Sequence, residues 1–180
     1  MPYHLEDGRV THTDDYGEVD SEIVFTPASG ETPFQIVSAT IKQGANAGFI
    51  QRVLMKMIMN SMHAALWDVV AEVEGKPYQL QGRQPTNGFD LAGLIQYIYN
   101  KIYGVAFPAN LKQQMHAVQL VPVDQVMPGD IVFWVNNRLI TNAGIYLGGG
   151  RYLTVDVLAG QVQVKEIGSA WMPNYVGSLR

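Results

Sequence analysis

Apolar residues recur at helical spacing in the middle of the chain. They are Leu91, Leu94, Ile95, Ile98 and Ile102. Asp90 stands directly before this run, where a carboxylate accepts hydrogen bonds from the free amides of a first helical turn, and Gly104 follows it. The spacing therefore predicts a buried helix that begins at Leu91 and ends at Gly104.

The same spacing predicts two helices earlier in the chain. Apolar residues recur over residues 49–58 and again over residues 62–73. Ser61 stands between the two runs, where its hydroxyl would cap the start of the second helix. Four of the eight methionines lie between Met55 and Met62, and thioether side chains repack easily. We expect this cluster to pack against the rest of the protein, an adaptable binding face being the alternative.

Alternating apolar and polar residues predict strands at both ends of the chain. Residues 22–26 and 34–41 flank a turn at residues 27–33 that contains Pro and Gly, a pattern typical of a hairpin. The polar residues 1–20 before it are interpreted as an extended or mobile arm. After the middle of the chain, short turns separate four runs that predict an antiparallel meander, at 131–135, 142–147, 151–157 and 161–167.

The composition is that of a globular protein, with 47% apolar and 16% charged residues. The formal net charge is −4 and there is no basic run, so we expect no nucleic-acid partner, which would need clustered Lys and Arg. We also expect no membrane span, because charge or glycine breaks every apolar run. The first residues lack the basic and apolar regions of a secretory signal.

The absence of cysteine limits the chemistry further. The chain has no disulfide, no thiolate metal site and no cysteine nucleophile. Its four histidines are His4, His12, His63 and His116. They lack the spacing of metal ligands on a common face, so we expect neither a metal site nor a cofactor.

Four sequence blocks follow one another in order over the second part of the chain. They are Gly75–Tyr78, Asn87–Tyr99, Val126–Trp134 and Thr141–Gly148. These blocks resemble the NlpC-type cell-wall peptidases, which are cysteine hydrolases of papain-like fold. The resemblance implies an α+β fold, with helices packed on an antiparallel β-sheet over residues 61–180. Residues 1–60 would form an N-terminal extension of arm, hairpin and methionine-rich helix.

The catalytic residues of that family do not carry over. The segment Asp90–Gly93 reads Asp-Leu-Ala-Gly where the family has Asp-Cys-Ser-Gly, so Leu91 stands at the position of the nucleophile. Asn142 stands at the position of the catalytic His, and Thr154 at the position of the residue that orients it. Leu91 has no ionisable proton, and the amide of Asn142 is no base near neutral pH. We infer a natural loss of peptidase activity.

The resemblance also places Tyr78 beside the family's catalytic cleft, although a Tyr that merely covers the end of the sheet is the plainer interpretation. If a groove persists, Tyr78, Asp90, Leu91, Asn142 and Thr154 would line it and bind a peptide without cutting it. A remote alternative pairs Asp90 with Asp156 as carboxylates that share a proton. The simpler roles are a helix cap for Asp90 and an outward strand or turn residue for Asp156.

Three functions follow from these observations. The first is a catalytically inactive binding or regulatory module for a cell-wall peptide or a protein partner. The second is a structural or assembly protein that forms a homo-oligomer, or binds a protein partner, through residues 1–60. The third is a hydrolase with relocated catalytic residues. The sequence as it stands suggests the cytoplasm, whereas the resemblance implies a site outside the membrane, so localisation stays open.

Overall fold

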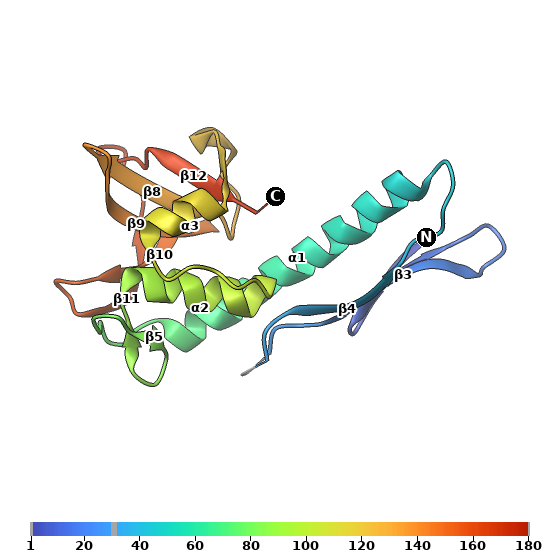
Figure 1. Cartoon of the computed structure of the whole chain (residues 1–180), viewed down its shortest axis with the longest axis horizontal. Helices are drawn as coiled ribbons and strands as arrows, with labels where there is room; N and C mark the ends of the chain where they lie inside the picture. Colours follow the sequence, from blue (N-terminus) through green and yellow to red (C-terminus); the bar gives the residue numbers. More distant parts are fainter. Residues whose placement is uncertain (1, 30–31, 180) are drawn as a thin grey trace. The chain divides into compact units, whose positions relative to one another are not determined.

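The computed structural model of the chain describes residues 2–29 and 32–179. Its residue contacts divide the chain into two compact units. One holds the residues up to Ala65 together with Lys101–Gly104, and the other holds Leu66–Asn100 and Val105–Arg180. The longest helix, α1 (Ala47–Val73), contributes residues to both units (Figure 1).

A four-stranded antiparallel sheet builds the N-terminal unit. Its strands, paired in chain order, are β1 (Tyr3–Glu6), β2 (Arg9–Thr13), β3 (Val19–Thr26) and β4 (Gln35–Thr40). The predicted hairpin is confirmed by β3 and β4, and residues 30 and 31 of its predicted turn lie outside the described residues. The interpretation of residues 1–20 as an extended or mobile arm is wrong, because β1 and β2 pair with each other and β2 pairs with β3.

Tertiary contacts explain why this polar segment folds. Val10 of β2 is fully buried and packs in one cluster with residues of β3 and α1. Polar pairs then join the strands, since the Arg9 guanidinium lies 2.9 Å from the Glu22 carboxylate and Nδ1 of His12 lies 2.7 Å from Oδ1 of Asp20. One apolar anchor and two polar side-chain contacts therefore order a segment whose composition is typical of a mobile arm.

The His12–Asp20 contact makes the stability of this unit depend on pH. The hydrogen bond from His12 and the attraction of its charge lower the pKa of Asp20, and burial opposes them. The carboxylate is thus favoured in the folded state, so its stabilisation is complete above the unfolded pKa of about 3.9 and is lost as pH falls through the lower folded value. We expect the Tm advantage of wild type over Asp20→Asn to shrink as the pH falls below the unfolded pKa of the carboxyl group. Calorimetry would contradict this expectation by finding a constant difference.

The two helices predicted on either side of Ser61 form one continuous helix, α1. Ser61 lies inside it, so its predicted role as a cap is wrong. The reason is that no Gly or Pro interrupts residues 49–74, and one Ser costs a helix interior only a few tenths of a kcal/mol, roughly. The boundary predicted between residues 60 and 61 falls within this helix.

A six-stranded antiparallel sheet builds the C-terminal unit, in the order β11-β10-β9-β8-β12-β7. Its strands are β7 (Gln119–Val121), β8 (Ile131–Asn136), β9 (Leu139–Gly148), β10 (Arg151–Asp156), β11 (Gln161–Glu166) and β12 (Tyr175–Ser178). The predicted meander is confirmed by β8 to β11. The sequence pattern did not reveal β7 and β12, which extend the sheet beyond β8.

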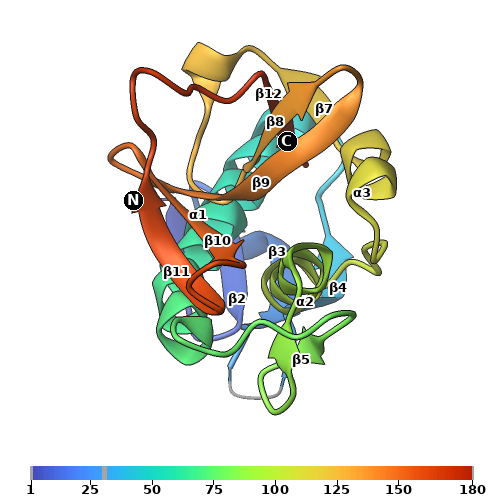
Figure 2. The same ribbon diagram turned by 90° about the vertical axis from the view of Figure 1, so that its left-hand side faces the viewer.

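Two helices, two short strands and a 3-10 turn complete the chain. They are β5 (Arg83–Gln84), β6 (Gly88–Phe89), α2 (Leu91–Tyr103), α3 (Leu111–Ala117) and η1 (Val123–Gln125). Helix α2 confirms the central prediction, as it begins at Leu91 and ends directly before Gly104. Figure 2 looks nearly along α2 and shows β9 and α3 on the same side of it. Within the described residues, no helix has the length and apolar character needed to cross a bilayer.

Candidate functional site

The first turn of α2 is held by Asp90, as predicted. Its Oδ1 accepts a hydrogen bond from the Gly93 amide at 2.7 Å, which caps the helix. Its Oδ2 accepts another from the Gln81 amide at 3.1 Å. One carboxylate therefore fixes both the start of α2 and the loop that lies against it.

Gly93 allows this loop to approach the helix closely. A Cβ atom at Gly93 would lie 1.9 Å from the carbonyl oxygen of Gly82, far inside contact distance. The loop that ends at Gly82 also carries Tyr78 and Leu80. The glycine and the cap together thus place these two side chains beside the start of α2.

Helix α3 is fixed to the same place by Gln114. This side chain is fully buried, and its Nε2 donates to the carbonyl oxygens of Ala92 at 2.9 Å and Pro108 at 2.7 Å. Asn110 caps the helix by accepting from the Gln113 amide at 3.1 Å. The apolar face of α3 is thereby held next to the first turn of α2.

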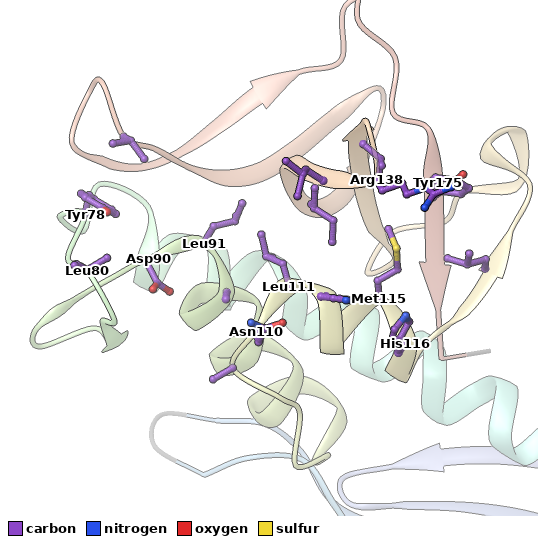
Figure 3. Close-up of a pocket in the computed structure, with 18 residues that line it drawn as sticks. Tyr78, Leu80, Asp90, Leu91, Asn110, Leu111, Met115, His116, Arg138 and Tyr175 are labelled. Atoms are coloured by element: carbon purple, nitrogen blue, oxygen red, sulfur yellow. The ribbon is translucent and has the colours of Figure 1, made fainter.

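A cleft of about 880 Å³ opens where these elements meet the β8–β9 hairpin (Figure 3). Most of its lining is apolar, and the larger aliphatic residues include Leu80, Leu91, Leu111, Met115, Leu139 and Ile140. Leu91 is only half-buried, so it lines the cleft without filling it. Among the residues that the structure describes, none that lines the cleft is a Ser, Thr or Cys.

The structure brings together three of the five residues proposed for binding. Tyr78, Asp90 and Leu91 line the cleft, whereas Asn142 and Thr154 do not. The Asn142 amide donates to the Tyr152 hydroxyl at 3.3 Å. The buried Thr154 hydroxyl donates to the Ala143 carbonyl at 2.7 Å. The prediction that Asn142 and Thr154 line the groove is therefore wrong. The binding role of each of the five residues remains a prediction.

A β-bulge explains why Asn142 is not among the residues that line the cleft. Trp134 pairs with Asn142 and Val135 pairs with Ile140, which leaves Thr141 as an extra residue of β9. Directly paired residues share a face of the sheet, and consecutive residues of β8 lie on opposite faces. Ile140 therefore joins Val135 in the cleft wall, while Asn142 lies on the face of Trp134.

The carboxylate pair that formed the remote alternative is otherwise engaged. Oδ2 of Asp156 lies 2.7 Å from Nζ of Lys165, and its Oδ1 accepts from the Ala159 amide at 2.9 Å. The Lys165 hydrogen bond lowers the pKa of Asp156, whereas a shared proton requires a raised one. Because both oxygens of Asp90 also accept backbone hydrogen bonds, the two residues do not form an acid-base dyad.

Sequence reasoning missed several residues that line the cleft. Met115 and His116 of α3 do so, and so do Arg138 and Leu139 of the β8–β9 hairpin. The one available signal was Leu139, an apolar residue directly after a polar turn, whose side chain is 70% exposed. No three His, Asp or Glu side chains of residues 2–29 and 32–179 are grouped as a metal site.

Comparisons with known proteins agree with this architecture. The model of the NlpC/P60 family matches residues 75–180. A gamma-DL-glutamyl hydrolase of Bacillus subtilis is 38% identical over 90 residues, which cover 47% of this chain and 22% of that protein. The chain spans less than half the length of several curated relatives that it matches.

Solved structures show the same fold. The NlpC/p60 domain of the peptidoglycan hydrolase SagA superposes with a TM-score of 0.58 at 27% identity, over 65% of this chain and 98% of that one. RipD of Mycobacterium tuberculosis, a non-catalytic NlpC/p60 domain protein adapted to peptidoglycan binding, superposes with a TM-score of 0.54 at 25% identity, over 66% of this chain and 98% of that one. The predicted papain-like α+β fold is confirmed, and the chain belongs to the NlpC/P60 family.

Proposed function

We propose that this protein is a non-catalytic NlpC/P60 module that binds a cell-wall peptide in the cleft at the start of α2. The observation that carries the proposal is Leu91, an aliphatic residue at the position where the family resemblance implies a nucleophile. The chain has no cysteine to replace it. The cleft nevertheless stays open, so the site has lost the groups that cut while keeping a concave surface that can bind.

The chemistry of the cleft supports binding over hydrolysis. An acyl transfer needs a nucleophile within reach of a base. His116 lines the cleft, but no described residue of the lining is a Ser, Thr or Cys that it could activate. Apolar side chains gain free energy when a ligand displaces water from them, at about 25 cal/mol for each Å² buried. RipD, a non-catalytic relative adapted to peptidoglycan binding, gives a precedent for this division of roles.

Cosedimentation with purified, insoluble peptidoglycan tests the proposal. We expect the protein to appear in the pellet, and we expect chromatography of the supernatant to show no released muropeptides after prolonged incubation. Release of muropeptides by the wild-type protein would show it to be a hydrolase. If the protein stayed in the supernatant, the proposal that it binds peptidoglycan would be wrong.

A second function, self-association, is favoured by one observation in the N-terminal unit. β4 is an edge strand, all six of its residues are exposed, and none is charged or Pro. Such an edge can pair antiparallel with the same strand of a second copy. Light scattering after size exclusion should then give a dimer for wild type and a monomer for Val37→Lys, whose charge would oppose pairing. A monomeric wild type would contradict this second function.

A further inference from the structure

The charged residues of the cleft are unequally distributed along its length. Figure 3 shows Tyr78, Leu80 and Asp90 at one end, and Arg138 and His116 toward the other. Lys112 of α3 also lines the cleft. Asp90 and Arg138 therefore lie apart and do not neutralise each other, and the cleft has two chemically different ends.

The negative charge at the first end is already engaged. Both oxygens of Asp90 accept hydrogen bonds from backbone amides, those of Gly93 and Gln81. Hydrogen bonds of this kind stabilise the carboxylate and occupy one acceptor position on each of its oxygens. The first end thus offers mainly the Tyr78 ring and the Leu80 side chain.

The two cationic side chains Arg138 and Lys112 in the cleft lining are not paired with carboxylates in the part of the chain that the structure describes. Over the described residues, Arg138 and Lys112 have no carboxylate partner, whereas Arg9 pairs with Glu22 and Lys165 pairs with Asp156. Arg138 sits in the tight β8–β9 turn, where Asn137 and Arg138 have φ values of 51° and 68°. This left-handed pair is typical of a type I′ turn, so the backbone that carries the guanidinium is fixed by the hairpin.

We infer that the cleft has a direction, and that it holds a muropeptide with apolar groups along Leu91 and a free carboxylate at the Arg138 end. The inference rests on the proposed function and adds the orientation of the ligand. A guanidinium is suited to this role because its parallel N–H groups match the two oxygens of a carboxylate. Arg138 is exposed, so water and salt screen the contact and its effect on affinity is about threefold.

The experiment compares two forms of one probe. Soluble muropeptides are used either with their carboxyl groups intact or after conversion of these groups to methylamides, and calorimetry measures their binding to the full chain. We expect the amide form to bind wild type about threefold more weakly than the acid form. We expect Arg138→Gln to lose about threefold in affinity for the acid form only, and Arg138→Lys to lose less.

Arg83→Gln is the matched control, because it removes the same charge from an exposed residue outside the cleft lining. It should leave both affinities unchanged, and circular dichroism should show that each variant is folded. Equal binding of the acid and amide forms by wild type would overturn the orientation and leave the proposed function standing. An equal loss of affinity for both forms in Arg138→Gln would also overturn the orientation. If wild type bound neither form, both the orientation and the proposed binding function would be wrong.

Discussion

Gly93→Ala is expected to destabilise this protein by about 3 kcal/mol or more, a large fraction of the stability of an ordinary domain. The added Cβ would lie 1.9 Å from the Gly82 carbonyl oxygen and 3.0 Å from Oδ1 of Asp90. The first of these atoms belongs to the backbone of a loop that Asp90 ties to the helix, so it cannot rotate away. Either the loop separates from α2 or the cap is lost.

Urea denaturation measures this effect as a fall in the midpoint concentration at similar slope. Gly168→Ala is the matched control, because no atom lies within 4 Å of a Cβ built there and its backbone is not left-handed. This control should be neutral or slightly stabilising, since Ala restricts the unfolded chain. Equal midpoints for the two variants would show that the loop does not depend on the close approach at Gly93.

The same contact gives the residues of the Asp90–Gly93 segment different roles. Asp90 and Gly93 hold the loop against the helix. Leu91 and Ala92 line the cleft, as Asp90 also does. Asp90 therefore belongs both to the scaffold and to the cleft wall, whereas the side chain of Leu91 has no hydrogen-bonding group.

The start of α2 was predictable because its signals are local. A capping carboxylate, an apolar run at helical spacing and a final glycine all lie within residues 90–104. The opposite wall of the cleft was not predictable, because strict alternation places Ile140 and Asn142 on one face. The bulge at Thr141 separates them, and no Gly in the segment Leu139–Asn142 signals it.

Other differences arise where tertiary pairing outweighs local composition. β1 and β2 lie in a polar segment that is ordered by its neighbours β3 and α1. β12 is a short strand that pairs with β8, for example at Tyr175 and Phe133. These residues are far apart in the sequence, and the local alternation of apolar and polar residues does not reveal such a partner. Sequence reasoning therefore gave the helix that carries the site, while the shape of the cleft depends on pairings between distant segments.

Leu91→Asp is expected to weaken muropeptide binding by roughly thirtyfold or more while leaving the fold intact. Loss of the apolar side chain from the cleft removes about 2 kcal/mol of favourable burial, which corresponds to roughly thirtyfold in affinity. The new carboxylate would also have to lose water when a ligand binds. The helix itself should tolerate the change, because a negative charge in the first turn of a helix interacts favourably with its dipole.

Calorimetric titration with muropeptides and a thermal melt separate these two effects. Leu158→Asp provides the control, since it makes the same chemical change at a fully exposed leucine outside the cleft lining. A similar Tm in both variants, with binding lost only in Leu91→Asp, would show that Leu91 belongs to the binding site. Unchanged binding in Leu91→Asp would place the ligand elsewhere on the protein, because a carboxylate at the centre of an apolar cleft cannot be neutral toward a ligand that covers it.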